Sequence, residues 1–464
     1  MSNPDLAIIG AGPAGMAAAD EAASLGLSVL LLDEQPTLGG QIYRDVERVA
    51  PLRGAVLGQD YLDGLPLAKR MARDGIEHVA GAMVWQVTQD GTITYSKDNC
   101  SFEIRAGHIL IATGAVERPM PLPGWTLPSV MSVGAGQILL KQSGLIPNEA
   151  VLIGSGPLLY VLAYQMLKAK RPPLAMVETQ TMGDMAAAMP HLGGALRGWR
   201  YLLKGSKLLA ALMLGGVKRY TGAKVISLEG EDMLRAVRFE ARGKPHRLEC
   251  QTALLHHGVV PNNQISLSLG LAHSWNQQQT CFCPDLDKWG QTSLSHVFVA
   301  GDGAGIGGAK AAELAGKLSA LRIAEQAGRI SAIALAAKAK SLQALKAREL
   351  SARPFLDRAY PPFKEAISPK DETIICRCEE VTAGTIRTLA KQGSQGPNQL
   401  KTFSRAGMGP CQGRGCGLTV SSLMAEQSGK SMDEVGYFNI RPPLKPVTLG
   451  ELASLQEEDS RSQA

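Results

Sequence analysis

The sequence predicts an α/β protein with two similar strand–helix–strand domains and a small domain after them. The first observation is a buried strand, a glycine-rich turn and a helix at residues 5–25, an order typical of a parallel sheet covered by helices. The second is the return of this pattern at residues 150–170, which indicates a second domain of the same type. The third is a group of four cysteines after residue 370, outside both repeats. Together they predict a chain with three structural parts.

Length and composition fit this arrangement. A chain of 464 residues is too long for one ordinary core, and 45% hydrophobic with 19% charged residues is typical of a soluble globular protein. The net charge of +6 is spread along the chain and 5% of the residues are aromatic, which disfavours nucleic-acid binding. The longest strongly apolar stretch, at 208–217, is about half the length needed to span a bilayer. We therefore expect no transmembrane segment, no targeting segment and a cytoplasmic protein.

The first glycine motif lies where the first strand turns into a helix. Gly10 permits the tight turn, Gly12 allows backbone to approach a pyrophosphate, and Gly15 lets helix and strand pack closely. The helix N-terminus favours the negative charge of a pyrophosphate. Asp33 ends the second strand, where a carboxylate can accept hydrogen bonds from an adenosine ribose. The segment predicts a Rossmann-like dinucleotide site with the contact residues Gly10, Gly12, Pro13, Ala14, Gly15, Asp33 and Glu34.

Three further segments favour FAD over NAD as the ligand of this site. The glycine pair in 37–44 lets the chain pass close to a flavin, and 108–115 is another buried strand that ends in glycine. In 297–308, Asp302 can hold a ribityl hydroxyl, and the helix that follows favours negative charge on a reduced isoalloxazine. The FAD contacts expected in these segments are Gly40, Gln41, Thr113, Gly114, Gly301 and Asp302.

The order of the motifs IIGAGPAG, GGQ, ATGA, GSGPLL and VAGD resembles the flavoproteins with two dinucleotide-binding domains, which include glutathione and thioredoxin reductases. The resemblance covers residues 5–328 and implies a glutathione-reductase-like fold, in which a second Rossmann-like domain interrupts a discontinuous FAD domain. The expected parts are the FAD domain (1–122 and 256–330), the second domain (123–255), a helical linker (331–370), the cysteine-bearing domain (371–430) and a C-terminal tail (431–464).

The second glycine motif departs from the first. Gly154 and Gly156 remain, but Leu159 replaces the third glycine, so ordinary NAD geometry is in doubt. Glu178 ends the next strand, where it can bind a ribose and would repel the 2′-phosphate of NADP. Three alternatives stay open for this domain: NAD(H) as a working substrate, an adenine nucleotide (ATP or NAD) held statically, and an empty site.

The remaining cysteines and a histidine pair give weaker signals. No redox disulfide is expected near the flavin, because Cys281 and Cys283 are the only close pair in residues 1–330 and are interpreted as two loop cysteines. Cys100 and Cys250 stand alone and are interpreted as packing residues. The pair at 256–257 follows a buried strand, which favours structural histidines.

The four C-terminal cysteines have a distinctive spacing. Cys376-x-Cys378 is followed by Cys411-x4-Cys416 after 32 intervening residues. Structural zinc usually takes cysteine pairs with two to four intervening residues, whereas the first pair here has one, which disfavours zinc. Plant-type ferredoxins space their four cysteines differently from this segment. The loop at 407–417 consists largely of small residues, which lets backbone N–H groups point at sulfur. Nearby arginines can offset the charge of four thiolates; they are Arg377, Arg405 and Arg414.

This segment resembles the small [2Fe–2S] domain of bacterioferritin-associated ferredoxin, which nitrite reductases also contain. The resemblance implies that Cys376, Cys378, Cys411 and Cys416 ligate a [2Fe–2S] cluster. Zinc and unliganded thiols are the alternatives.

The whole chain resembles one family more closely. The segments DEQPTLGGQIYR, IATGAVERPMPLPGW, GSGPLLY and RPPLKPVTLGELA, together with the cysteine domain, resemble the α (A) subunits of opine oxidases, the B subunits of hydrogen cyanide synthases and the α subunits of hydroxyproline and proline dehydrogenases. The resemblance implies an FAD-dependent oxidoreductase acting on CH–NH donors, as one subunit of a complex. An FAD-dependent amine-oxidase-like β subunit oxidises the substrate, a small ferredoxin-like γ subunit is an optional member, and this chain passes electrons to an acceptor such as a quinone.

The residues agree with this division of labour. No His, Arg and Tyr set brackets the predicted flavin, so we expect no catalytic residue for substrate oxidation on this chain. A stand-alone NADH-dependent reductase of an iron–sulfur partner and a non-catalytic nucleotide-binding scaffold are the alternatives. An FMN at a subunit interface and a peripheral position at the inner membrane, through the electron acceptor, are left open.

Overall fold

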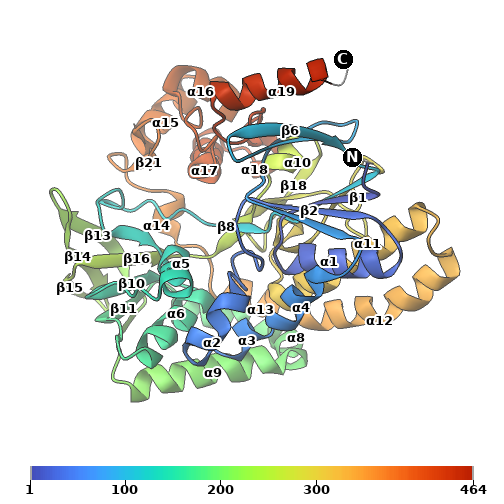
Figure 1. Cartoon of the computed structure of the whole chain (residues 1–464). Coiled ribbons are helices and arrows are strands. Elements are labelled where there is room, and N and C mark those ends of the chain that lie inside the picture. Colours follow the sequence, from blue (N-terminus) through green and yellow to red (C-terminus); the bar gives the residue numbers. More distant parts are fainter. Residues whose placement is uncertain (1–2, 462–464) are drawn as a thin grey trace.

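A five-stranded parallel sheet forms the centre of the first domain. The computed structural model describes residues 3–461 (Figure 1). The strand order is β20-β7-β1-β2-β3. Strand β20, the last of these five along the chain, therefore lies beside β7 although the whole second domain separates them in sequence. Helix α1 packs on this sheet and α11 packs on α1, and a three-stranded antiparallel sheet is inserted after β3. The bounds are β1 Leu6–Ile9, α1 Pro13–Ser24, β2 Val29–Asp33, β3 Ile76–Ala80, β4 Met83–Val87, β5 Thr92–Lys97, β6 Cys100–Arg105, β7 His108–Ile111, β20 Val297–Val299, η3 Gly301–Ala304 and α11 Ala309–Gln326.

A second five-stranded sheet, with the order β12-β11-β10-β16-β9, forms the centre of the second domain. The two domains are joined by one antiparallel pair of short strands, β8 and β17. The bounds are β8 Ala115–Glu117, β9 Val130–Ser132, α5 Val133–Ser143, β10 Ala150–Gly154, α6 Pro157–Lys168, β11 Ala175–Glu178, α7 Met182–Ala188, η2 Met189–His191, α8 Leu192–Arg197, α9 Trp199–Leu214, β12 Lys218–Thr221, β13 Lys224–Gly230, β14 Leu234–Ala241, β15 Lys244–Glu249, β16 Thr252–His256 and β17 Val259–Pro261. The predicted fold class, with two Rossmann-like domains and a discontinuous first one, is confirmed.

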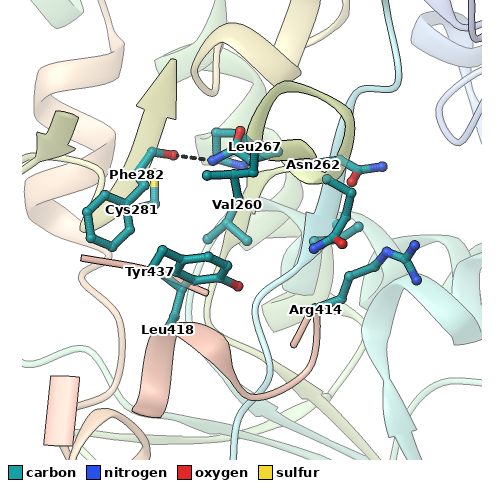
Figure 2. Close-up of a pocket in the computed structure, with 12 residues that line it drawn as sticks. Val260, Asn262, Leu267, Cys281, Phe282, Arg414, Leu418 and Tyr437 are labelled. Atoms are coloured by element: carbon teal, nitrogen blue, oxygen red, sulfur yellow. Dashed lines mark hydrogen bonds between the residues drawn. The ribbon is translucent and has the colours of Figure 1, made fainter. Parts of the chain in front are cut away.

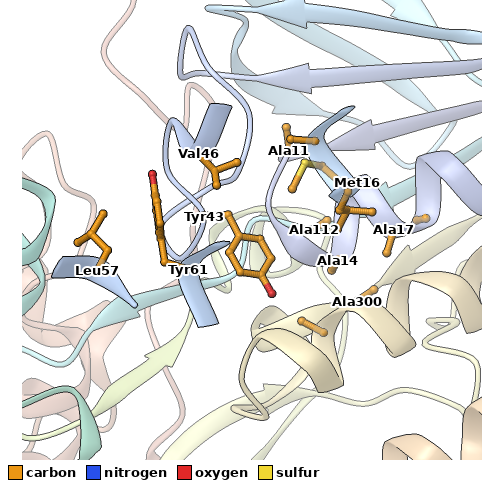
Figure 3. Packing of buried hydrophobic residues seen from close by; sticks show 14 of the residues in the cluster. Ala11, Ala14, Met16, Ala17, Tyr43, Val46, Leu57, Tyr61, Ala112 and Ala300 are labelled. Atoms are coloured by element: carbon orange, nitrogen blue, oxygen red, sulfur yellow. The ribbon is translucent and has the colours of Figure 1, made fainter. Parts of the chain in front are cut away.

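Small residues bring α1 and α11 unusually close together. A Cβ on Gly316 would lie 2.1 Å from the carbonyl oxygen of Ala14, so glycine is required where the helices cross. Figure 3 shows the core beside this crossing, where Tyr43 points toward α11 among alanines. Tyr43 is fully buried and its hydroxyl donates to Glu313 on α11, at 2.7 Å. The segment after β2 is thereby fixed to the first sheet; its helices are α2 Val46–Leu57, α3 Gln59–Leu62, α4 Leu65–Lys69 and η1 Arg70–Ala72.

The chain between the domains and the cysteines is more structured than its prolines suggest. The expected long helix is α12, Ala332–Leu350. Two short helices follow, α13 (Arg353–Ala359) and α14 (Lys364–Ile367), and they lie against the second domain. We call residues 353–368 the strap. Between β17 and β20 the first domain also contains a short helix and a hairpin. They are α10 Gln264–Ser268, β18 His273–Asn276 and β19 Cys281–Pro284.

The C-terminal domain consists of a small hairpin and short helices. Its elements are β21 Ile374–Cys376, β22 Val381–Thr382, α15 Ala383–Lys391, α16 Pro397–Ser404, α17 Gly417–Ser428 and α18 Met432–Val435. It lies on top of both sheets in Figure 1. Trp125 of the second domain donates its indole N–H to the Ile374 carbonyl at 2.6 Å, and Leu444 donates its N–H to the Trp85 carbonyl of the first domain at 2.7 Å. Both domains therefore hold it.

The last part of the described chain is helical. Residues 456–461 belong to a helix, α19 (Leu449–Arg461), which begins with Thr448 and Glu451 bonded to each other. Ser454 on this helix accepts a hydrogen bond from the Ser101 N–H of β6. Ordering these residues into a helix costs chain entropy, and their polar composition alone would not offset that cost. The contact with the three-stranded sheet does. Residues 462–464 lie outside the described residues. No helix within 3–461 is long and apolar enough to cross a membrane.

Candidate functional site

The first glycine motif forms the turn that the sequence predicts. A Cβ on Gly15 would lie 1.9 Å from the carbonyl oxygen of Gly10 and 3.2 Å from Ile8, so this position requires glycine for α1 to pack on β1. Pro13 is the first residue of α1, and no side chain caps the helix. Its first-turn N–H groups are therefore available to an anionic ligand, as a pyrophosphate site requires. Ala14 is held from behind by α11, so the turn is rigid before any ligand arrives.

Asp33 has a structural role that could not be predicted from the sequence. Its carboxylate accepts the Ala11 N–H at 2.5 Å and the Gln35 N–H at 2.7 Å, which ties the glycine turn to the end of β2. Burial raises the pKa of Asp33, although the two backbone bonds oppose this. Each oxygen keeps a free lone pair, so the ribose role remains chemically available. Glu34 is exposed and pairs with Lys445 of the C-terminal tail at 2.6 Å.

The other predicted flavin contacts converge on the same turn. A Cβ on Gly40 would lie 2.8 Å from the Cα of Gly12, so the glycine pair passes directly over the motif. Gln41 is exposed, and its carbonyl accepts a bond from the buried ammonium of Lys141 at 2.8 Å. Lys141 also donates to the Ile42 carbonyl at 2.9 Å, and burial lowers its pKa to about 7. Sequence reasoning missed this lysine, because its partners lie about a hundred residues away.

The remaining two pairs close the site. Gly301 packs against Ala14 of α1, and Asp302 accepts the N–H groups of residues 307 and 308, each at 2.9 Å, just before α11. Thr113 and Gly114 meet residue 262 across the β8–β17 junction. Uncapped helix N-termini, close backbone approaches and two carboxylates are groups that fit FAD. The structure brings the predicted residues of this site together around one turn.

The second glycine motif, unlike the first, is covered by another segment of the chain. Gly154 ends β10, Gly156 precedes α6, and Leu159 is fully buried in the core. Between the glycines, the buried Ser155 donates its hydroxyl to the Pro361 carbonyl of the strap, at 3.2 Å. Phe363 of the strap donates its N–H to His257 at 3.1 Å. The strap therefore lies at the carboxyl ends of β10 and β16, where a dinucleotide binds in a Rossmann-like domain.

Glu178 is likewise occupied. It is fully buried, and its carboxylate accepts bonds from Arg219 (2.5 and 2.8 Å), Tyr160 (2.9 Å) and Gln180 (2.6 Å). In this structure Glu178 is therefore bonded to protein groups, and its ribose role stays a prediction. The physical reason is the arginine on β12, which lies 41 residues further along and neutralises the carboxylate. No motif spacing reveals such a partner.

We predict that Arg219→Leu destabilises the second domain strongly. Removing one partner of a buried ion pair leaves an uncompensated charge, which typically costs about 3–5 kcal/mol. The Arg219 side chain is 22% exposed, so we expect the lower end of that range. The midpoint of urea unfolding, followed by tryptophan fluorescence, measures the effect. The double variant Arg219→Leu with Glu178→Gln should recover more than half of the loss; no recovery would contradict an ion-pair origin.

The four C-terminal thiols meet in two pairs. Hydrogen bonds join Cys376 to Cys416 and Cys378 to Cys411. The bond from Cys416, followed by backbone N–H groups that include that of Gly407, lowers the pKa of Cys376 to about 6. The same bond and burial raise the pKa of Cys416. The other three thiols all act electrostatically on Cys416, so the two pairs lie next to each other.

The fit of an iron–sulfur cluster rests on this donor set. In the part of the chain that the structure describes, no group of three or more His, Cys, Asp or Glu side chains is arranged to hold a metal ion, so the fit depends on the chemistry of the thiols. Paired thiols with inward backbone N–H groups suit a cluster with two irons, which takes four Cys ligands. The residues therefore fit a [2Fe–2S] cluster through their chemistry.

The glycines of the cysteine loop have a second cause. A Cβ on Gly413 would lie 2.5 Å from the ring of Phe438, and one on Gly409 would lie 2.2 Å from the Cβ of Cys378. These glycines are therefore needed for packing against the aromatic ring and for the close approach of the cysteines. The predicted role of the loop's backbone N–H groups is an additional reason. Of the three arginines, Arg377 stacks on Trp125, Arg405 pairs with Glu379, and Arg414 donates to the Leu444 carbonyl beside Cys411.

A pocket lies between the cysteine loop and the first domain. Figure 2 shows Arg414, Leu418 and Tyr437 on one side and Asn262, Val260 and Phe282 on the other. The Asn262 N–H donates to the Gly114 carbonyl at 3.0 Å. The same pocket is therefore bordered by residues next to the predicted cluster and residues bonded to a predicted flavin contact. Sequence reasoning missed this convergence because Asn262 and Arg414 lie 152 positions apart.

The structure agrees with some of the expectations for the other cysteines and the histidine pair and corrects others. All eight thiols are free, and Cys281 lies 4.0 Å from Cys283 on β19 rather than in a loop. Cys250 is buried, as expected, but Cys100 is exposed because it begins the edge strand β6, so its packing role is wrong. The two histidines are buried, with bonds to Glu117 and to the residue 119 carbonyl, which agrees with structural roles.

Two family models match the chain. Residues 4–328 match the model described as pyridine nucleotide-disulphide oxidoreductase, and residues 370–456 match the model described as the sarcosine oxidase A3 domain. The first therefore covers both sheets, and the second covers the four cysteines and most of the tail.

Two curated relatives and one solved structure match nearly the whole chain. The opine oxidase A subunit of Rhizobium meliloti (strain 1021) is 42% identical over 98% of this chain and 100% of that protein. Hydrogen cyanide synthase subunit HcnB of Pseudomonas aeruginosa is 32% identical, over 97% and 98% respectively. The crystal structure of L-proline dehydrogenase from P. horikoshii superposes with a TM-score of 0.69 at 18% identity, covering 97% of this chain and 79% of that one, which shows a shared fold.

Proposed function

Since the chain belongs to the pyridine nucleotide-disulphide oxidoreductase family, in the group that contains the opine oxidase A subunits, we propose that it is the FAD- and [2Fe–2S]-containing electron-transfer subunit of a heteromeric amino-acid or opine dehydrogenase. A partner of the FAD-dependent amine-oxidase type oxidises the CH–NH bond. This chain takes up the electrons and passes them to a respiratory acceptor such as a quinone. A small ferredoxin-like protein and an FMN at a subunit interface are optional additions to the complex.

The pocket of Figure 2 is the observation that carries the proposal. Bound FAD supplies two-electron chemistry and a [2Fe–2S] cluster one-electron chemistry, so a relay needs the two sites to be neighbours. Arg414, three residues after Cys411, lines the same pocket as Asn262, which is bonded to Gly114. Arg414 places a cation beside the thiolates, and Lys141 fixes the loop over the FAD turn. These side chains bind and orient; none is placed to deprotonate a substrate.

The strap favours this relay over a stand-alone NADH-dependent reductase. Residues of the strap bond to Ser155 and His257 where a nicotinamide nucleotide needs access. Glu178 is fully buried, and its carboxylate is paired with Arg219. We therefore propose that the second domain has a structural role and holds no NAD or ATP. The scaffold alternative is disfavoured because a scaffold has no use for four paired thiols.

We predict that the isolated chain, loaded with FAD, is reduced very slowly by any amino acid or opine. A missing positioned acid or base alone costs about 10²–10⁴-fold in rate, and the complex with its partner should be faster by at least that factor. Anaerobic stopped-flow measurement of flavin bleaching compares the two preparations, with NADH as a third donor. Rapid bleaching of the isolated chain by an amine would overturn the proposal, and rapid bleaching by NADH would establish the reductase alternative.

A further inference from the structure

The outer face of α9 (Trp199–Leu214) is apolar although nothing in the described part of the chain covers it. Trp199, Leu203 and Leu214 follow one another at helical spacing along this face, and Met213 lies beside them. Their exposed fractions are 50%, 44%, 90% and 67%, in the order Trp199, Leu203, Leu214, Met213. The opposite face packs on α6, with Leu212 fully buried. The stripe is therefore additional to the core contact that the helix already makes.

The charges around this stripe have one sign. From residue 185 to residue 228 the sequence contains no Asp or Glu. Arg200 and Lys207 lie at the border of the stripe, exposed, and neither forms an ion pair with any described residue. The acids that contact side chains of this helix each have a partner on it: Asp60 forms an ion pair with Lys204, and Glu349 accepts the Tyr201 hydroxyl at 2.5 Å. The two free cations therefore flank an apolar surface along one edge.

We propose that α9 is a docking helix for an anionic lipid surface, lying in the plane of the membrane with Trp199, Leu203, Met213 and Leu214 inserted among the lipid headgroups. A helix with an apolar stripe, a cationic border and an indole ring is the type that binds at bilayer interfaces. Because Leu212 and its neighbours remain packed on α6, the helix can enter the lipid only to the depth of its outer side chains. The inference goes beyond the proposed function, since binding to lipid requires neither cofactor.

Charge complementarity favours lipid over a protein partner as the occupant. Protein interface cores are depleted of lysine, whereas anionic headgroups attract each nearby Lys or Arg. The position of α9 agrees: it lies at the lower edge of the molecule in Figure 1, on the side away from α15 and α17. A bilayer under α9 would leave the C-terminal domain and the pocket of Figure 2 free for protein partners.

Vesicle co-sedimentation of the full chain, and of its purified complex, tests this proposal. We expect binding to vesicles of phosphatidylglycerol and phosphatidylcholine, much weaker binding to phosphatidylcholine alone, and loss of binding in high salt. Leu203→Glu should lower the partition coefficient by about tenfold or more, because an acid replaces an inserted side chain next to anionic lipid. The double variant Arg200→Gln with Lys207→Gln should lower it by a similar factor on the anionic vesicles only.

The matched control is Ile333→Glu on α12, an equally conspicuous apolar residue that is 84% exposed and lies outside the proposed docking helix. It should bind as the unaltered chain does, and all variants should keep the same thermal midpoint and the same activity with a soluble acceptor. Failure of the unaltered chain to bind anionic vesicles, or equal binding by all variants, overturns the proposal. So does loss of the partner protein from the Leu203→Glu complex, which would assign the face to a protein.

Discussion

The variant Gly15→Val should purify without FAD. A Cβ at this position would lie 1.9 Å from the Gly10 carbonyl oxygen, and the γ-methyl groups of valine would extend the conflict to Ile8. Relief requires α1 to move away from β1, but Gly316 of α11 holds it from the other side, with no space for a shift. Overpacking of this kind costs about 1–3 kcal/mol or more. The displaced turn also removes the N–H groups that would meet the pyrophosphate, so we expect FAD affinity to fall at least ~100-fold.

The measurement is the flavin content after gel filtration, together with the dissociation constant for added FAD. Gly205→Val is the matched control: Gly205 also lies within a helix, α9, and a Cβ there meets no atom within 4 Å. It should retain full flavin. To separate loss of the site from global unfolding, the reactivity of the four thiols of the C-terminal domain reports on a region away from the turn. Stoichiometric FAD in Gly15→Val would contradict the assignment of this turn as the flavin site.

The local part of this architecture could be predicted from the sequence, because its causes are local. A strand, a glycine turn and a helix occupy consecutive residues, so Gly10, Gly12 and Gly15 could be assigned their places from spacing alone. The duplicated pattern predicted the second sheet for the same reason. The short helix after the first cysteine pair also has a local cause, because the Thr382 side chain caps the start of α15.

The parts that escaped prediction depend on residues far apart in sequence. Glu178 matches a ribose ligand until Arg219 is placed beside it, and Ser155 matches a phosphate loop until Pro361 covers it. Periodicity and spacing carry no information about such partners. The apolar stretch at 208–217 was recognised as too short to span a bilayer, but only the packing of α9 on α6 shows which of its side chains stay outside.

The position of the cysteines lies between these cases. Their spacing predicted a common site, and the structure brings Cys376 to Cys416 and Cys378 to Cys411. The loop between them depends on Phe438 and Tyr437, which lie outside the domain boundaries expected from the sequence. The match of residues 370–456 to one family model agrees with a unit that extends into the tail.

Replacement of Cys411 by serine should remove iron and acid-labile sulfide while FAD stays bound. Serine places a hydroxyl of much higher pKa where the cluster needs a thiolate, so the fourth ligand is lost under neutral conditions. Cys411 faces Cys378 and is half-exposed, so the change leaves no buried cavity and the domain should fold. With the one-electron carrier gone, the complex should lose at least ~100-fold of its substrate-driven reduction of a quinone, since electron transfer then depends on direct contact with the flavin.

The matched control for this change is Cys100→Ser, because Cys100 is exposed on the edge of the three-stranded sheet and belongs to no pair of thiols in the described residues. It should keep iron, sulfide, flavin and activity. Reduction of the flavin by substrate through the partner protein should remain fast in Cys411→Ser, because that step precedes the cluster. A split of this kind, with flavin reduction kept and quinone reduction lost, is what distinguishes a relay from a scaffold. Full quinone activity without iron would leave the four thiols with no part in electron transfer and would support the scaffold alternative instead.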